Sequence, residues 1–198
     1  MNATSTADTD IRQHILDVAK PLILCKGFTA VGLTELLAAA QVPKGSFYHY
    51  FASKEAFGEA LLSSYFSSHL AQLDDMFARP APAAQRLMSY FEYWLAAQAG
   101  DDPAAKCLAV KLSAEVSDLS ESMRKVLDQG TRGITQRLET CIAAGLADGS
   151  LPRAQDAGAL AMTLYQTWLG ASLMEKISRS RAPLESAMAG TRELLKAA

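Results

Sequence analysis

Strict alternation of apolar and polar residues, the pattern of a half-buried β-strand, is nearly absent from this chain. Apolar residues instead recur every three or four positions, as at Ile11, Ile15 and Val18, which is the spacing of one helix face. Alanine and leucine, both strong helix formers, dominate the composition. Of the 198 residues, 49% are hydrophobic and 20% are charged, so the chain can bury a core and is not mainly disordered. The sequence therefore predicts an all-α protein.

Proline, glycine and aspartate residues divide the chain into about nine helical segments. The segments we expect are 10–26, 33–40, one that begins near residue 44, 54–78, 83–98, 104–116, 119–147, 154–179 and 184–196. The second and third are short and are joined by the turn Gln41-Val42-Pro43, which is typical of a helix-turn-helix unit. The predicted organisation is a disordered tail (1–9), a three-helix domain (10–53) and a larger helical domain (54–198).

Several classes of protein are disfavoured by the sequence. Three widely spaced cysteines, with no histidine at ligand spacing, predict neither a disulfide framework nor a metal site. Residues 1–10 do not resemble an export signal, so we expect a cytoplasmic protein. The uncharged stretch 157–174 contains too many polar residues for a membrane span and predicts a helix buried by its own core and a second subunit. Since no nucleophile–base set and no phosphate-binding loop is visible, we expect neither an enzyme nor a cofactor.

The segment 42–55 carries the most informative chemistry. Lys44 can neutralise a phosphate, and the backbone N–H groups of Lys44, Gly45 and Ser46 begin a helix, where anions are favoured. Gly45 lets DNA approach the backbone, while Tyr48 and His49 can reach phosphates or base edges. The alternative is a buried turn with exposed polar residues. Residues 1–59 hold five Lys or Arg and six Asp or Glu, so affinity must come from a few contacts doubled in a dimer.

Three stretches of this region resemble the DNA-binding domain of the TetR family of transcriptional repressors. They are Gly27-Phe28, Leu33-Thr34-Glu35-Leu36 and the KGSFYHYF segment with the SKE that follows it. The resemblance implies a ligand-sensing, dimerising C-terminal bundle and a homodimer on a palindromic operator. It also implies DNA contacts from Thr34, Lys44, Gly45, Ser46, Tyr48, His49 and Lys54. The sequence departs from the family at Val31-Gly32, where many members place Thr or Ser, and at Pro43, where Ser or Ala is usual.

The C-terminal half resembles the branch of that family that responds to N-ethylmaleimide and other reactive electrophiles. The matching stretches are 107–116, 118–121, 168–171 and 176–180. In that branch the cysteine matching Cys107 is the expected sensor. Lys106, Lys111 and a nearby helix N-terminus would lower the pKa of its thiol, although a small core residue is the alternative. Lys176 would approach Cys107, or would only stabilise the end of its own helix.

We therefore expect a homodimeric repressor that leaves its operator when Cys107 reacts with an electrophile or oxidant. Cys25 and Cys141 continue apolar stripes and are predicted to be structural. Trp168 and Gly170 lie in the helix that we expect to dimerise. One alternative is a repressor released by a reversibly bound apolar molecule, with structural cysteines. The other is a thiol enzyme or a plain helical interaction module.

Overall fold

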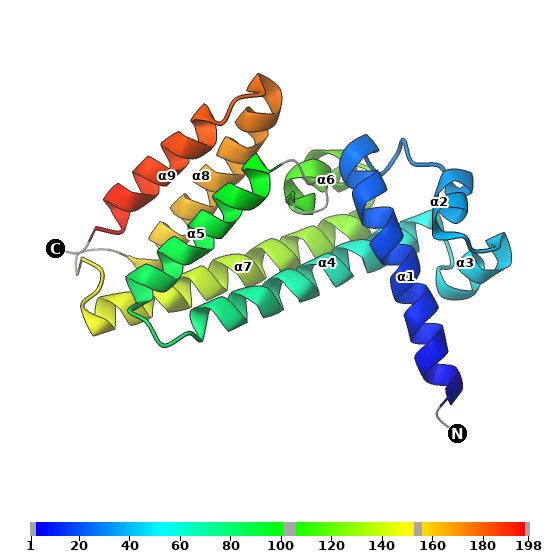
Figure 1. The fold of residues 1–198 in the computed structure, drawn as a ribbon, viewed down its shortest axis with the longest axis horizontal. Coiled ribbons are helices and arrows are strands. Elements are labelled where there is room, and N and C mark those ends of the chain that lie inside the picture. Colours follow the sequence, from blue (N-terminus) through cyan, green and yellow to red (C-terminus); the bar gives the residue numbers. More distant parts are fainter. Residues whose placement is uncertain (1–2, 101–105, 153–155, 197–198) are drawn as a thin grey trace. The chain divides into compact units, whose positions relative to one another are not determined.

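The computed structural model describes residues 3–100, 106–152 and 156–196, which form nine helices and no strand (Figure 1). The all-α prediction is confirmed. The helices are α1 (Ala3–Lys26), α2 (Leu33–Ala40), α3 (Lys44–Tyr50), α4 (Lys54–Phe77), α5 (Ala83–Ala99), α6 (Leu108–Ser117), α7 (Glu121–Asp148), α8 (Ala157–Ser178) and α9 (Ala182–Leu194).

Some helix starts differ from those predicted. Helix α1 begins at Ala3 and thus includes most of the expected tail, since residues 3–9 contain no glycine or proline to stop a helix that grows from the packed part. Helix α6 begins at Leu108 with Cys107 as its N-cap residue, and not at residue 104. The predicted cap of that helix, Asp102-Pro103, and the predicted start of α8 at residue 154 lie outside the described residues.

The chain divides into two compact units that do not follow its predicted domains. The first combines α1, α2, α3, the part of α4 up to Phe66, α6 and the part of α7 up to Asp128. The second combines the remainder of α4 and α7 with α5, α8 and α9. The sequence predicts a boundary near residue 53, but α6 from the C-terminal half joins the helix-turn-helix region because it contacts α1.

The first unit holds its short helices on an aromatic cluster. The rings of Phe47, Phe51 and Phe57 are all buried, with centroids 5.2–5.5 Å apart. Phe47 of α3 and Phe51 after it thus face the interior of the unit. Ser53 caps α4, because its Oγ accepts a hydrogen bond from the N–H of Ala56 at 3.0 Å. The cluster anchors α3 while the opposite side of that helix is free to carry polar residues.

The second unit has an indole at its centre. Trp168 of α8 stacks on Phe91 of α5 at 5.3 Å, and its Nε1–H donates to Oγ1 of Thr191 in α9 at 2.9 Å. Trp168 is fully buried, so it packs within its own subunit and is not part of a surface, whereas Gly170 is exposed. Among the described residues, no helix has the length and hydropathy needed to cross a membrane.

Candidate nucleic-acid interface and cysteine site

The turn between α2 and α3 is built by the backbone of Gln41. This residue adopts the left-handed conformation (φ 55°), and the N–H of Val42 then donates to the carbonyl of Leu37 at 3.2 Å. Pro43 follows as the N-cap residue of α3. The extended conformation of Pro43 ends the turn, so the two short helices form the helix-turn-helix unit that the sequence predicts.

Five of the seven predicted DNA-contact residues are exposed on this unit: Thr34, Lys44, Gly45, Tyr48 and His49. On α3 they recur at a spacing of three or four residues and so share one face. The ammonium of Lys44 lies 5.9 Å from the centre of the Tyr48 ring, which places a cation beside a phenol that can donate to a phosphate or base. A Cβ at Gly45 would meet no atom within 4 Å, so the backbone there is open to a close approach.

The other two predicted contact residues have roles inside the protein. Ser46 is half-buried, and its N–H donates to the carbonyl of Pro43 at 3.0 Å, so this amide serves the turn. Lys54 is also half-buried, and its ammonium donates to the carbonyl of Thr29 at 3.3 Å and lies 5.0 Å from the centre of the Phe28 ring. Lys54 thus fastens the segment between α1 and α2.

Cys107 lies half-buried at the start of α6, where the hydroxyl of Tyr65 in α4 donates a hydrogen bond to its Sγ at 3.3 Å. Burial raises the pKa of the Cys107 thiol above its ordinary value of 9.0, against the effects of Tyr65 and of the Lys20 ammonium, which favour the thiolate. Lys20 lies 5.7 Å from the centre of the Tyr65 ring. Three helices, α1, α4 and α6, therefore surround the thiol.

The expectation of a lowered thiol pKa is wrong in direction, because burial outweighs the charges. The cation that favours the thiolate is Lys20, which is distant in sequence from Cys107. Lys111 instead donates to the carbonyl of Cys25 at 3.2 Å. Lys176 lies in the last turn of α8, in the other compact unit, so its approach to Cys107 stays a prediction.

The remaining cysteines differ from each other. Cys141 is buried, as expected of a core residue, and burial raises the pKa of its thiol to about 11. Cys25, predicted to continue the buried stripe of α1, is exposed. The described residues contain no group of His, Cys, Asp or Glu side chains arranged to hold a metal ion.

One acidic residue of the first unit was missed by sequence reasoning. The carboxylate of Glu115 in α6 accepts the N–H of Phe28 at 3.1 Å and the N–H of Thr29 at 2.6 Å. Burial acts to raise the pKa of Glu115, but the hydrogen bonds from Thr29 and Phe28 outweigh it and hold the pKa below 4.5. No local motif marks a carboxylate that caps a turn 86 residues earlier in the chain.

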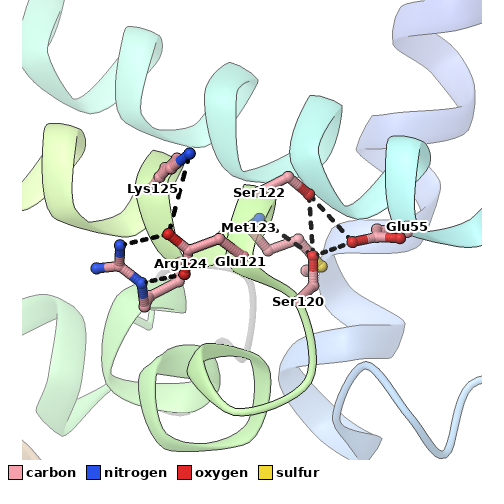
Figure 2. A network of polar contacts seen from close by, with 7 residues as sticks. All are labelled: Glu55, Ser120, Glu121, Ser122, Met123, Arg124 and Lys125. Carbon is pink, nitrogen blue, oxygen red and sulfur yellow. Dashed lines mark hydrogen bonds and ion pairs between the residues drawn. The ribbon is translucent and has the colours of Figure 1, made fainter.

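A second polar network joins the start of α7 to the first turn of α4 (Figure 2). The hydroxyls of Ser120 and Ser122 both donate to Oε1 of Glu55, the latter at 3.2 Å. Oγ of Ser120 also accepts the N–H of Met123 at 3.3 Å, which caps α7. Figure 2 further shows Glu121 directed to Arg124 and Lys125 of its own helix.

Two family comparisons agree with this geometry. Residues 15–61 match the family described as "Bacterial regulatory proteins, tetR family", and residues 83–191 match "Tetracyclin repressor-like, C-terminal domain". The chain belongs to the TetR family of transcriptional regulators. The first match covers the second half of α1, α2, α3 and the start of α4, and so includes the helix-turn-helix unit described above.

Individual relatives are similar over nearly the whole chain. The transcriptional repressor NemR of Escherichia coli (strain K12) is 41% identical over 94% of both chains, and the repressor DhaR of Mycobacterium sp. (strain GP1) is 34% identical over 90% of this chain and 89% of its own. The crystal structure of the reduced form of E. coli NemR superimposes with a TM-score of 0.90 at 42% identity, covering 96% of this chain and 98% of that one. Like these relatives, the chain is a transcriptional repressor and not an enzyme.

Proposed function

We propose that this repressor binds a palindromic operator as a homodimer and leaves it when Cys107 reacts with an electrophile or oxidant. The observation that carries the proposal is the placement of Cys107. Its sulfur is joined to α4 through Tyr65. The helix that it begins is bonded to the end of α1 through Lys111 and to the α1–α2 segment through Glu115. A change in volume at the sulfur would therefore act on elements that carry the DNA-binding unit.

The DNA contacts in this proposal come from the exposed face of α3 and from Thr34. If Lys44 contacts a phosphate, Lys44→Ala weakens operator binding. The slope of log affinity against log salt then becomes less steep by about one unit. Lys196→Ala, at the end of α9, is the control, because its ammonium pairs with Glu193. An unchanged slope in Lys44→Ala would remove this residue from the phosphate contacts.

The dimer contact in this proposal is the exposed stripe of α8. Its apolar members are Met162, Leu173, Met174 and Ile177. The threonines on the same side need no outside partner, because Thr163 donates to the carbonyl of Ala159 at 2.8 Å and Thr167 to that of Thr163 at 2.7 Å. Gly170 leaves room for a second helix, since a Cβ there would meet no atom within 4 Å. Such a stripe suits a two-fold contact between copies of α8.

The reaction that we propose begins with loss of the thiol proton. With a maleimide, the thiolate sulfur forms a bond to one alkene carbon, and the electron pair of the broken π bond takes a proton from water at the other carbon. With hydrogen peroxide, the sulfur bonds to one oxygen and the O–O bond breaks, which leaves a sulfenic acid and water. Either product is larger and more polar than the thiol that Tyr65 contacts.

A second candidate function is release by a reversibly bound apolar molecule. It is favoured by the raised pKa of the Cys107 thiol, which reduces the thiolate fraction at neutral pH. The two candidates differ in what reverses them. A thiol reductant restores operator binding after mild oxidation of a sensor cysteine, but it has no effect on a non-covalent ligand.

The deciding experiment measures operator binding and intact mass on the same samples after graded peroxide or maleimide treatment. The expected result is that operator release follows modification of Cys107, without unfolding, and that Cys107→Ser stays bound. Cys25→Ser and Cys141→Ser serve as matched controls and should respond like wild type. Release of Cys107→Ser as complete as that of wild type would refute the sensor role.

A further inference from the structure

The segment between α1 and α2, residues 27–32, is held by two helices that follow it in the chain. Thr29 is bonded through both of its backbone polar groups: its N–H donates to Glu115 of α6 at 2.6 Å, and its carbonyl accepts from Lys54 of α4 at 3.3 Å. The neighbouring N–H of Phe28 donates to the second oxygen of Glu115 at 3.1 Å. A single carboxylate thus satisfies two consecutive amides of a segment that forms no helix of its own.

The chain provides room and matching charges for this contact. Gly27 has a φ of +94°, and a Cβ there would lie 2.9 Å from Oε2 of Glu115, so only glycine allows the carboxylate to come this close. One turn earlier on α6, the ammonium of Lys111 donates to the carbonyl of Cys25 at 3.2 Å. The cation therefore meets the carbonyl end of α1, and the anion meets the amides that follow it.

The far end of α6 is also fastened. Beyond it, Ser120 and Ser122 bond to Glu55 in the first turn of α4, as seen in Figure 2. Residues 107–122 are accordingly joined to α4 at both ends, through Tyr65 and through Glu55, and to the α1–α2 segment in between. Hydrogen bonds therefore connect this segment to α4 and to the α1–α2 segment along its whole length.

The start of helix α2 is held by contacts from elsewhere in the unit. Its N-cap residue is Gly32, which has no side chain to accept a hydrogen bond from the first turn. The start of the helix that carries Thr34 is therefore not set by its own cap. The groups that hold the chain near this start are the amides bound to Glu115, the Thr29 carbonyl bound to Lys54, and the ion pair of Lys26 with Glu35 at 2.5 Å.

We infer that Glu115 is a positioning residue for operator recognition. From outside the helix-turn-helix unit, it holds the α1–α2 segment in the orientation in which α2 and α3 meet DNA. The inference rests on the DNA-binding function of the family and does not require Cys107 to be a sensor. Glu115, which lies in the C-terminal half of the chain, thereby contributes to the affinity and specificity with which the N-terminal half binds DNA.

The charge of Glu115 makes it possible to distinguish a positioning effect on operator affinity from a purely electrostatic one. Glu115→Gln removes a negative charge, which by itself increases the affinity of a protein for DNA. The glutamine keeps the length of the side chain but presents an N–H₂ group to one of the two amides, so at least one hydrogen bond is lost. Loss of positioning and loss of charge thus change operator affinity in opposite directions.

The matched control is Glu121→Gln. This glutamate is exposed, lies in the same compact unit and bonds to Arg124 and Lys125 of its own helix (Figure 2). It undergoes the same chemical change without touching the α1–α2 segment. Glu115→Asp is the second variant, because it retains the charge but shortens the reach by one methylene.

The experiment measures binding to a palindromic duplex that the wild-type protein selects from a random pool, and to a scrambled duplex of equal length. All measurements are made well below the melting temperature of each variant. Hydrogen exchange of the amides over residues 27–32 is followed in parallel. In Glu115→Gln we expect the amides of residues 27–32 to exchange faster and the operator affinity to fall about tenfold. Its affinity for the scrambled duplex should be unchanged or slightly higher.

The controls separate positioning from folding and from charge. Glu121→Gln should bind the operator as well as wild type or slightly better, and Glu115→Asp should lose specific affinity although its charge is retained. Faster exchange in Glu115→Gln with operator affinity equal to or above that of wild type would overturn the inference, since the contact would then only stabilise the fold. An equal loss on both duplexes would overturn it too.

Discussion

The hydroxyl of Tyr65 donates a hydrogen bond to Sγ of Cys107 at 3.3 Å, from α4 to the first residue before α6. Hydrogen bonding to the sulfur favours the thiolate and thereby opposes the effect of burial on the thiol pKa. A residue 42 positions away in the chain therefore counteracts part of the effect of burial on Cys107.

Tyr65→Phe should therefore raise the pKa of the Cys107 thiol further and slow its alkylation at neutral pH by about tenfold. The rate of maleimide addition would be followed by intact mass across a pH series, in a Cys25→Ser, Cys141→Ser background. The midpoint of the pH profile should move to higher pH. Tyr93→Phe, an exposed tyrosine of α5, is the control; identical profiles for both variants would mean that Tyr65 does not tune the thiol.

Ile177 is the most exposed large apolar residue of α8, with 66% of its surface accessible. In a two-fold contact each substitution occurs twice, so Ile177→Glu buries two charges without partners. We expect the dissociation constant of its dimer to be about tenfold or more above that of wild type, with a matching loss of operator affinity. Sedimentation velocity would measure this, with Gln85→Glu on the exposed side of α5 as control. Equal sedimentation of all three proteins would exclude this stripe from the interface.

Gly27 and Gly149 form a matched pair for testing the space that Glu115 needs. Both have positive φ, of 94° and 77°, so alanine is strained at either position by about 1–2 kcal/mol. Only at Gly27 does a new Cβ meet another residue, the carboxylate of Glu115 at 2.9 Å, whereas nothing lies within 4 Å at Gly149. Gly27→Ala should thus lower the free energy of unfolding by about 1 kcal/mol more than Gly149→Ala, since Glu115 must leave its hydrogen bonds.

Urea denaturation of both variants gives this difference directly. Hydrogen exchange at Phe28 and Thr29 should rise in Gly27→Ala and stay at the wild-type level in Gly149→Ala. Equal losses of stability together with unchanged exchange would mean that the carboxylate tolerates the extra carbon.

The lowered pKa of Glu115 also predicts that the stability of the fold depends on pH. Its pKa in the folded protein lies below 4.5, because hydrogen bonds from Thr29 and Phe28 outweigh burial. Its contribution to stability is therefore fully present above the pKa of the unfolded chain and is lost as the pH falls through the folded value. The difference in unfolding free energy between wild type and Glu115→Gln should shrink as the pH falls from about 5 through the lowered folded pKa of Glu115.

Salt distinguishes this contribution from that of an exposed ion pair. The partners of Glu115 include neutral amides, so its pH dependence should persist at about 0.5 M salt, whereas that of Glu121, which pairs with Arg124, should weaken. If Glu115→Gln showed the same pH dependence as wild type at both salt concentrations, the carboxylate would not be held as described.

The sequence alone was enough for the elements whose cause is local. Apolar spacing predicted the helices, and the turn at Gln41–Pro43 predicted the helix-turn-helix unit. The residue pattern of segment 44–55 was by itself enough to indicate the DNA-binding family. These features depend on residues within about one or two helical turns of one another, where spacing is informative.

The tertiary structure decided every property that depends on residues distant in the chain. It assigned Trp168, which lies in the helix expected to dimerise, to the core of its own subunit, because Phe91 and Thr191 contact its ring and its N–H. It placed Tyr65 and Lys20 beside Cys107 and showed that burial outweighs nearby charge at the thiol. The physical reason is that burial and hydrogen-bond partners are set by which helices pack together, and helical periodicity tells which face is buried but not what covers it.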